Sequence, residues 1–350
     1  MRRMQLSALT TLRLGGPAGR YVEAGTEEAV FSAIRDEREP LLVMSGGSNL
    51  VVADAGFPGT VVRIVSRGVA REDATLEVAA GEQWDPFVAS CVEQGLAGVE
   101  CLAGIPGSVG ATPIQNVGAY GQEVADTITA VRVLDRRDGE VRELAPADCG
   151  FTYRSSAFKR HPDRWVVLAV RFVLEQSELS APIRYAELAR TLGVELGERA
   201  PLAAVREAVL GLRRGKGMVL DPTDPDTVSA GSFFTNPVLD ARGFAALEAR
   251  ADAPPPGWPQ DDGHVKTSAA WLIERAGFHR GYGNPSGIAI SSKHTLALTN
   301  RGAGTTAELV ALAREIAGGV YDAFGVALTP EPVFVGHTWT SLEGRRTVAP

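Results

Sequence analysis

The apolar positions along the chain change their spacing from region to region, and each spacing predicts a different kind of element. In the first third, short apolar runs typical of strands alternate with segments in which apolar residues recur every three or four positions, as on one face of a helix. The expected strands are 41–44 and 61–64, and the first expected helix is 27–36. This alternation predicts an α/β or α+β region.

The next helix has its own start and stop signals. Asp85 is the expected N-cap, Pro86 stands in the first turn, and Gly95 follows the last apolar position. Farther along, the pattern predicts three strands and a hairpin turn at Asp138-Gly139. These strands are 131–134, 141–144 and 165–174.

Helical spacing returns in the last part of the chain and predicts a second domain. In the final helix, Thr305 or Thr306 is the expected cap and Gly325 the expected end. The prolines of residues 251–263 predict a loop or an insertion, and we expect the tail beyond His337 to be frayed. The three expected helices are 202–214, 266–276 and 305–324.

The composition is that of an ordinary globular protein with a sizeable core, since 45% of the 350 residues are apolar and 22% are charged. A net charge of −7 provides no overall positive field for a nucleic acid or an anionic membrane. No apolar run approaches the roughly 20 residues of a membrane-spanning helix, and the first residues do not read as a secretory signal. We therefore expect a cytoplasmic protein, and nothing in the sequence indicates an obligate protein partner.

Cysteine and histidine are few and scattered. Cys91, Cys101 and Cys149 lack the spacing of a disulfide framework or a metal knuckle, so we expect reduced thiols in the core. The five histidines stand singly and no HExxH motif is present, so no metal site is expected. The GxGxxG fingerprint of dinucleotide-binding folds, the phosphate loop GxxxxGK[ST] and the GxSxG serine elbow are also missing from the sequence.

Two clusters among the 39 glycines are informative. Glycine-rich loops between strands let backbone N–H groups approach a ligand, so the first cluster could cradle a phosphate, although an ordinary turn has the same composition. This first cluster consists of Ser45, Gly46, Gly47, Ser48 and Asn49. The second cluster, residues 104–121, places Ser108, Thr112, Gln115 and Asn116 in a mostly apolar loop, which predicts a half-buried polar ligand.

Several longer motifs follow one another in an order that matches a known family. Four of them are LAGIPGSVGATPIQNVGAYGQE, FTYRSSAFK, GSFFTNP and LTPEPVFVG, and two further segments are TLRLGGPA near the start and KTSAAWLIERAGF. With these motifs the chain resembles the UDP-N-acetylenolpyruvoylglucosamine reductase (MurB) family from about residue 10 to residue 336. Similarity over nearly the whole chain makes a chance match implausible.

The resemblance implies an oxidoreductase of peptidoglycan precursor synthesis, and hence of cell shape and division. Such an enzyme reduces UDP-N-acetylglucosamine enolpyruvate to UDP-N-acetylmuramate, with NADPH as reductant and dissociable FAD as hydride carrier. The implied fold is α+β, with a two-part FAD-binding region of the vanillyl-alcohol oxidase type, which needs no GxGxxG motif, and a C-terminal α+β substrate-binding domain. The expected parts are FAD-binding subdomains 1–65 and 66–204, a substrate-binding domain 205–325 and a C-terminal segment 326–350 that carries a catalytic Glu.

The resemblance also implies which residues bind the two ligands. Tyr185 would lie in a loop that closes over the nucleotide, as in the longer form of the family, and Lys216 and Asn236 would contact the diphosphate. Tyr120 and His294 would line the same substrate cavity. The expected FAD residues are Ser45, Gly46, Gly47, Ser48, Asn49, Ile105, Pro106, Gly107, Ser108, Gly110, Ala111, Ile114 and Tyr153.

Three residues match the chemical needs of the reduction. Hydride addition to the vinyl carbon turns the substrate carboxylate into an enediolate, which requires donors beside the carboxylate and a proton donor beside the α-carbon. The resemblance assigns Arg154 and Glu331 to the enediolate and Ser232 to the proton. From the residues alone, the plainer roles are a surface ion pair for Arg154, an exposed charge between loop prolines for Glu331, and a cap or turn residue for Ser232.

Two other functions stay open at this point. One is an oxidase of the same flavin fold; such oxidases often link the flavin to a His or Cys, and residues 45–64 contain neither. The other is a non-catalytic protein that binds flavin or a sugar nucleotide. That function would suit a chain lacking Ser232, Arg154 or Glu331, and all three are present.

Overall fold

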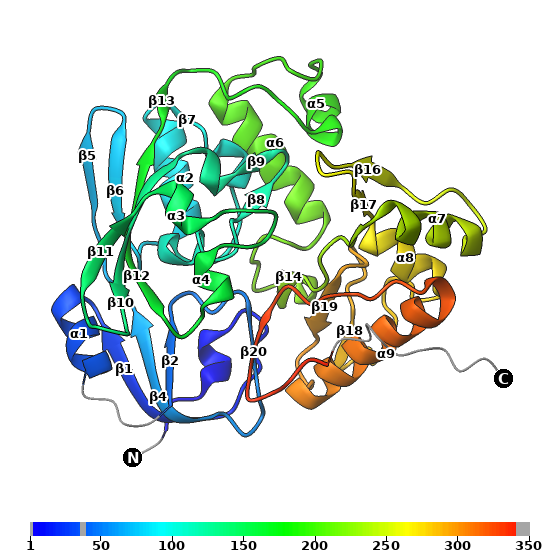
Figure 1. The fold of residues 1–350 in the computed structure, drawn as a ribbon, viewed down its shortest axis with the longest axis horizontal. Coiled ribbons are helices and arrows are strands. Elements are labelled where there is room, and N and C mark those ends of the chain that lie inside the picture. The colour runs from blue at the N-terminus through cyan, green and yellow to red at the C-terminus, as the bar shows by residue number, and fades with distance from the viewer. Residues whose placement is uncertain (1–2, 36–39, 341–350) are drawn as a thin grey trace. The chain divides into compact units, whose positions relative to one another are not determined.

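The computed structural model describes residues 3–35 and 40–340, and the chain divides into two compact units. Their course along the chain can be followed in Figure 1. Unit 1 consists of residues 1–4, 18–47 and 58–220, and unit 2 of residues 5–17, 48–57 and 221–350. Both units mix helices and strands, so the expected α+β class is confirmed.

Unit 1 contains a small parallel sheet in the order β1-β4-β2. Its strands are β1 (Ala18–Ala24), β2 (Leu41–Met44) and β4 (Phe57–Ile64), and α1 (Glu27–Arg35) follows β1. β2 runs parallel to β4. β1 is also parallel to β4, because Phe57 N donates to Pro17 O at the start of both strands and Val65 N donates to Ala24 O, at 2.9 Å, at their ends. The carboxyl ends of all three strands therefore lie at one edge, the edge at which parallel sheets commonly bind ligands.

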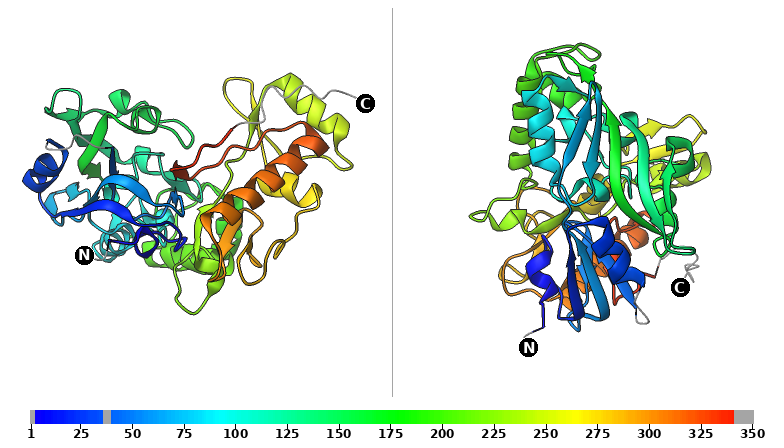
Figure 2. Two further views of the ribbon diagram at one scale, coloured as in Figure 1. Left: turned by 90° about the horizontal axis from the view of Figure 1, so that it is seen from below. Right: turned by 90° about the vertical axis from the view of Figure 1, so that its left-hand side faces the viewer.

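The second sheet of unit 1 is antiparallel, in the order β11-β10-β12-β6-β5. Two helices, α2 and α6, lie side by side next to it (Figure 2). The rings of Trp84, Phe87 and Phe172 pack with centroids 5.5 to 6.1 Å apart, so α2 and β12 share one core. The elements are β5 (Val69–Glu72), β6 (Thr75–Ala79), β10 (Ile128–Asp135), β11 (Val141–Leu144), β12 (Trp165–Val173), α2 (Trp84–Glu93) and α6 (Leu202–Gly215).

Shorter elements of unit 1 connect these layers. The two-stranded pair β8-β9 forms at the end of the second glycine cluster. In the second pair, β13 lies at the start of the segment that leads to α5 and is bonded to β7. The bounds are β7 (Leu96–Ala97), β8 (Gly118–Ala119), β9 (Gln122–Glu123), β13 (Glu175–Gln176), α3 (Pro146–Cys149), α4 (Ala157–Arg160) and α5 (Ala186–Leu192).

Unit 2 is built from small sheets in the orders β14-β19-β18 and β15-β17-β16, and from the parallel pair β20-β3. The long helix α9 packs its apolar face on β18 and β19, where Ile316, Ile290 and Leu298 share the buried core. The bounds are β3 (Leu50–Val52), β14 (Ser229–Ser232), β15 (Val238–Leu239), β16 (Gly257–Pro259), β17 (Val265–Thr267), β18 (Ile288–Ile290), β19 (Ala297–Asn300), β20 (Val333–Val335), α7 (Ala241–Arg250), α8 (Ala269–Arg275) and α9 (Thr306–Phe324).

The elements with strong local signals are confirmed. α9 begins after Thr305, whose hydroxyl accepts from Glu308 N at 3.2 Å, and it ends at Gly325, which has a φ of +70°. The hairpin between β10 and β11 turns at Gly139, which has a φ of +79°. The first expected helix is confirmed as far as Arg35; Asp36 lies outside the described residues, as does the part of the expected frayed tail beyond residue 340.

Asp85 is not the cap of α2. The helix begins at Trp84 with Gln83 as N-cap, so Asp85 lies in the first turn. Its Oδ1 accepts from Gly104 N at 2.6 Å, and its carboxylate pairs with Arg206 at 3.3 Å. The carboxylate of Asp85 therefore does not cap its own helix. It binds the second glycine cluster at Gly104 and helix α6 at Arg206.

Two further predictions fail in unit 2. The helix expected over 266–276 begins only at Ala269, because Lys266 pairs with both Val238 and Trp258 as the centre of a three-stranded sheet. For the same reason, 251–263 is not only a loop, since it contains β16. Pairing with strands that are distant in sequence overrides the local helical spacing here.

The division into two units does not follow the expected boundaries. Residues 48–57 belong to unit 2, in which Ala53 N donates to Val335 O at 2.8 Å, and α6 belongs to unit 1, where Val205 and Val209 are buried. Subdomains 1–65, 66–204, 205–325 and 326–350 stay a prediction.

The expected reduced thiols are confirmed, since Cys91, Cys101 and Cys149 are free and buried. Burial raises the pKa of Cys91 and of Cys149 to about 12, and it raises the pKa of Cys101 as well. The thiols therefore stay protonated and unreactive at neutral pH. In the described chain, no helix combines the length and apolar character needed to span a membrane.

Candidate active site

The first glycine cluster begins at the carboxyl edge of the parallel sheet, directly after β2. Ser45 Oγ donates to Ile64 O at 2.8 Å, which ties the loop to β4. A Cβ on Gly46 would lie 2.7 Å from Gly107 Cα, so the backbones of the two glycine clusters touch without room for a side chain. Gly47 has a φ of +60°. A left-handed glycine in such a loop is typical of the backbone nests that bind anions.

The second glycine cluster is held against the antiparallel sheet. Val109 N donates to Glu82 O and Gly110 N donates to Ala80 O, both at 2.9 Å. The hydroxyl of Ser108 is buried and has no hydrogen-bond partner in the described chain. An unpaired buried hydroxyl costs free energy, so it indicates that a polar ligand atom completes this loop.

The other expected FAD residues of this loop, Ile105, Pro106, Ala111 and Ile114, are half-buried. Ile114 is held in place because its carbonyl accepts from Ser156 Oγ at 2.5 Å.

A pocket of about 430 Å³ opens at the carboxyl edge of the parallel sheet, with Thr26, Ser66 and Ala79 in its lining. Its volume is in the range of small-molecule sites.

The structure assigns the two halves of the first glycine cluster to different units. Ser45, Gly46 and Gly47 belong to unit 1, whereas Ser48 and Asn49 belong to unit 2. In unit 2, Ser48 O accepts from Thr11 Oγ1 at 3.3 Å, and Asn49 Nδ2 donates to Glu331 O at 3.4 Å. Asn49 therefore lies beside an expected catalytic residue, and its contact with FAD stays a prediction.

Arg154 stands in unit 1 on a tight turn with a φ of +53°. Its guanidinium donates to Gly118 O at 2.6 Å and to Asn116 O at 3.4 Å, and it lies 5.6 Å from the centre of the Tyr153 ring. These contacts tie the side chain to the second glycine cluster. Arg154 is half-buried, so it is not the exposed surface arginine that the residues alone suggested.

Three expected substrate residues of unit 1 meet at the end of α6. The rings of Tyr120 and Tyr185 pack edge to face with centroids 5.4 Å apart, and Lys216 Nζ lies 5.6 Å from the centre of the Tyr120 ring. Lys216 Nζ also donates to Glu187 Oε2 at 2.7 Å. Burial would by itself lower the pKa of Lys216, but the hydrogen bond to Glu187 raises that pKa overall. Lys216 is therefore a cation at neutral pH.

Ser232 and Glu331 both belong to unit 2, on neighbouring backbone segments. Glu331 N donates to Phe233 O at 2.9 Å, next to the isolated bridge between Phe234 and Pro330, so the backbones of the two expected catalytic residues lie near each other. The register of β14 on β19 shifts between Ser229 and Ser232, where Gly231 has a φ of +73°. Such a bulge re-aims the side chain that follows it and is common beside active sites. Ser232 is a strand residue and not a helix cap.

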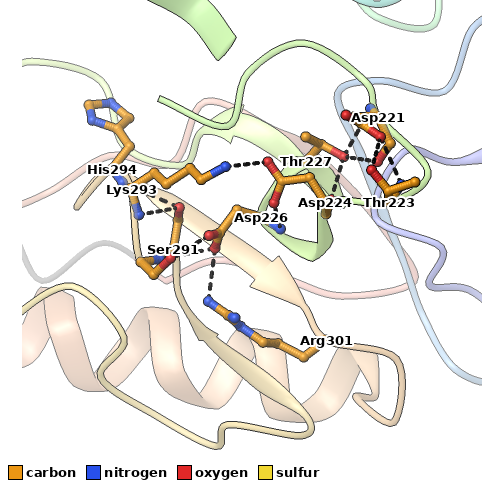
Figure 3. Close-up of polar contacts among 10 residues, drawn as sticks. Asp221, Thr223, Asp224, Asp226, Thr227, Ser291, Lys293, His294 and Arg301 are labelled. Atoms are coloured by element: carbon orange, nitrogen blue, oxygen red, sulfur yellow. Dashed lines mark hydrogen bonds and ion pairs between the residues drawn. The ribbon is translucent and has the colours of Figure 1, made fainter. Parts of the chain in front are cut away.

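The remaining two expected substrate residues, Asn236 and His294, also lie in unit 2. Asn236 Oδ1 accepts from Ala269 N at 3.0 Å and so helps to cap α8. His294 follows an ion-pair network between the β18–β19 turn and the segment before β14, and Figure 3 shows its imidazole pointing away from that network. The amide oxygen of Asn236 thus has a structural role, and contact of either residue with the substrate stays a prediction.

The network in Figure 3 holds the β18–β19 turn in place. Asp226 is buried; its carboxylate accepts from Ser292 N at 3.0 Å and pairs with Arg301 at 2.8 Å. Asp224 pairs with Lys293 at 2.5 Å. Burial works to raise the pKa of Asp226, but its hydrogen bonds from Ser292 and the charge of Arg301 lower that pKa overall.

The family of this chain follows from its similarity to known sequences and structures. Residues 222–335 match the family model described as UDP-N-acetylenolpyruvoylglucosamine reductase, C-terminal domain, and residues 18–145 match the FAD binding domain family. The UDP-N-acetylenolpyruvoylglucosamine reductase of Streptomyces coelicolor is 60% identical over 341 residues, covering 95% of this chain and 89% of the relative. The chain belongs to the MurB family.

Further members agree with this assignment. The MurB relative from Thermobifida fusca is 55% identical over 351 residues, covering 96% of this chain and 98% of the relative. The crystal structure of MurB from Thermus caldophilus matches with a TM-score of 0.67 and 26% identity over 95% of this chain and 98% of that chain. This MurB-family chain is thus an FAD-dependent oxidoreductase of peptidoglycan precursor synthesis, with FAD and NADPH as its cofactors.

The residues of unit 1 fit FAD. The touching backbones at Gly46 and Gly107 leave no room for side chains, and the Ser108 hydroxyl lacks a partner among the described residues. These features suit the pyrophosphate of a dinucleotide, which is commonly bound by backbone N–H groups and small hydroxyls.

Two residues of these sites were missed in the sequence. Glu187 follows Tyr185 by two positions, and its role depends on Lys216, which is distant in the chain. Asp226 carries no local signal, because its partners come from β19 and the turn before it.

Proposed function

We propose that this chain reduces UDP-N-acetylglucosamine enolpyruvate to UDP-N-acetylmuramate in the cytoplasm, with NADPH as reductant and non-covalently bound FAD. The observation that carries the proposal is the bulged strand of unit 2, which brings the backbone of Ser232 near that of Glu331, since Glu331 N donates to the carbonyl of the next residue, Phe233. Bulges of this kind re-aim a side chain and are common beside active sites, which supports a part for the Ser232 hydroxyl in proton transfer. The substrate class comes from the family to which the chain belongs.

FAD, which the residues of the two glycine clusters would hold, would supply the hydride chemistry that links NADPH to the vinyl carbon of the substrate. Ser232 Oγ donates a proton to the neighbouring α-carbon, so that the C=C bond becomes a C–C bond with two new C–H bonds. A serine hydroxyl is a weak acid, but the enediolate formed by hydride addition is strongly basic, which makes this transfer feasible. The serine regains its proton from water before the next turnover.

Arg154 and Glu331 are proposed to act on the substrate carboxylate. The guanidinium of Arg154 offers a planar fork of N–H donors, and the negative charge that builds on the carboxylate in the transition state strengthens these hydrogen bonds. Glu331, beside the same group, would serve as a hydrogen-bond donor in its protonated form or hold a water molecule there. Both roles require charge stabilisation that is stronger in the transition state than in the bound substrate.

The nucleotide half of the substrate is proposed to bind to Tyr120, Tyr185 and Lys216, with Asn236 and His294 as further contacts. Lys216 is a cation beside two aromatic rings, which suits a diphosphate and a sugar or base. The phenolic pKa of Tyr120 is raised by burial, so its hydroxyl stays protonated and able to donate.

The decisive experiment measures NADPH oxidation by the purified protein, with and without UDP-N-acetylglucosamine enolpyruvate, while the flavin absorbance of the same sample is recorded. We expect bound flavin and NADPH consumption in proportion to the added substrate, also under nitrogen. Bound flavin with oxidation that depends only on oxygen would favour an oxidase of the same fold. Bound flavin without either reaction would favour the non-catalytic binding protein, and the absence of flavin would contradict the proposal.

A further inference from the structure

The end of α6, within unit 1, carries an ion pair between Lys216 and Glu187 and a second, buried cation. Lys216 Nζ lies 2.7 Å from Glu187 Oε2, and their side chains are 29% and 35% exposed. Glu187 stands in the first turn of α5, two positions after Tyr185, which is the residue expected to close over the nucleotide. The carboxylate therefore occupies the ammonium group to which the function proposed above assigns the substrate diphosphate.

The second cation is Arg213, which is buried to 8% exposure. Its Nη2 donates to Met218 O at 2.9 Å, while its Nε is buried and has no hydrogen-bond partner in the described chain. Within the residues that the structure describes, Arg213 makes no ion pair of its own. The charge of Asp85 acts on Arg213, and Asp85 is itself paired with Arg206. The three cations Lys216, Arg206 and Arg213 therefore exceed the two carboxylates Glu187 and Asp85 by one charge, which leaves this region able to attract an anion.

The Lys216–Glu187 pair is stable enough to form and weak enough to open. Partly exposed ion pairs contribute about 0 to 1 kcal/mol, because solvent screens them and ordering two long side chains costs entropy. A diphosphate brings at least two negative charges to the same ammonium and can outcompete one carboxylate. Opening the Lys216–Glu187 pair costs the same free energy for every ligand that displaces the carboxylate. If Glu187 remained in place, its charge would repel the bound diphosphate.

We propose that Glu187 is a positioning residue, which holds the ammonium group of Lys216 in the free enzyme and is displaced from it by the substrate diphosphate. This inference rests on the proposed function, since it requires that the diphosphate binds at Lys216. The carboxylate lowers the affinity for the diphosphate, because its ion pair with Lys216 must open first, and it keeps Lys216 oriented while the site is empty.

The test compares Glu187→Gln with wild-type enzyme. We expect the KM for UDP-N-acetylglucosamine enolpyruvate to fall about two- to fivefold, the range that corresponds to losing a competing ion pair of up to about 1 kcal/mol, with kcat within about twofold. As an inhibitor, UDP should gain affinity by a similar factor, because its diphosphate would bind the same cation. The matched control is Glu207→Gln, which removes the carboxylate paired with Arg214 at 3.0 Å on the exposed side of α6 and should leave both constants unchanged.

Two further variants separate this inference from the proposed function. If Lys216→Ala leaves the KM unchanged, the diphosphate does not bind there and that part of the proposed function is wrong. If Lys216→Ala raises the KM but Glu187→Gln leaves it unchanged or raises it, the role of Glu187 is wrong. In the double variant, Glu187→Gln should have no further effect on the KM. Glu187→Ser replaces Glu187→Gln if the flavin content or the Tm of the latter falls, and the same outcomes apply.

Discussion

In unit 1, Asn116, Tyr120 and Arg154 stand on loops whose backbone is left-handed, with φ values of +46°, +49° and +53°, whereas in unit 2 Ser232 and Glu331 stand on hydrogen-bonded segments beside one another. A left-handed backbone costs a residue with a side chain about 1 kcal/mol or more. Such strain persists only where the surrounding contacts enforce it. In unit 1 the candidate residues are thus positioned by strained loops, and in unit 2 they are positioned by backbone hydrogen bonds between neighbouring segments.

The difference indicates what each unit supplies. Loops whose backbones touch, as at Gly46 and Gly107, expose N–H groups to a ligand, and small changes of the backbone spoil them. A ladder with a bulge at Gly231 keeps the backbone paired and changes only the direction of a side chain. We therefore expect ligand binding by unit 1 to be lost when a side chain is enlarged, and catalysis by unit 2 to be lost when a functional group is removed.

The largest expected effect is that of Ser232→Ala. Loss of the proposed proton donor should reduce kcat about 10³-fold, within the range that general acids contribute, while the bound flavin and the Tm stay unchanged. Steady-state NADPH oxidation with the enolpyruvyl substrate measures it. Ser286→Ala, on an exposed turn of the same unit, is the matched control and should keep full activity. Unchanged turnover in Ser232→Ala would remove serine from the mechanism.

The next largest effect is expected for Arg154→Lys. Lysine keeps the positive charge and meets the same backbone strain, but it lacks the fork of donors, so kcat/KM should fall about 10²-fold. The comparison variant is Arg160→Lys, an exposed arginine that donates to Gly150 O at 3.2 Å. If both variants behave alike, the guanidinium of Arg154 has no special part in the reaction.

Gly46→Ala tests the backbone contact in unit 1. The new Cβ would meet Gly107 Cα at 2.7 Å, so one glycine loop must shift, and we expect flavin affinity to fall by about tenfold or more. The flavin-to-protein absorbance ratio after gel filtration reports the change. Gly211→Ala is the control, because a Cβ there has open space in α6 and should stabilise the protein by about 0.5 to 1 kcal/mol. Full flavin content in Gly46→Ala would show that the loops tolerate bulk.

Asp226→Asn should have the smallest effect, confined to the stability of unit 2. Removing a buried charge partner of Arg301 should destabilise by about 2 kcal/mol at pH 7, seen as a lower Tm. Because the pKa of Asp226 is lowered by folding, its contribution is complete above the unfolded pKa of about 4 and is lost as the pH falls through the folded value.

The Tm difference between the wild type and Asp226→Asn should therefore shrink in acid. Asp252→Asn, which removes the exposed partner of Arg275, serves as the control and should lower the Tm very little at any pH. A difference for Asp226→Asn that persists unchanged at low pH would show that the loss has another cause than the carboxylate charge.

The sequence alone determined the features that depend on neighbouring residues. Helix α9 and its caps, the turn at Gly139, the buried thiols and the glycine loops could be predicted because capping, turn chemistry and apolar spacing act over a few residues. The four long motifs likewise indicated the family, and with it FAD, because each motif is a continuous run of residues whose order needs no folding to be recognised.

Tertiary structure alone decided the features that depend on distant partners. Lys266 lies in a strand because Val238 and Trp258 pair with it, and Asp85 holds Gly104 instead of capping α2. Glu187 meets Lys216 only in the folded chain. In each case a hydrogen bond or ion pair between residues far apart in sequence outweighs a local preference of a few tenths of a kcal/mol to about 1 kcal/mol, and no pattern within a short window records that partner.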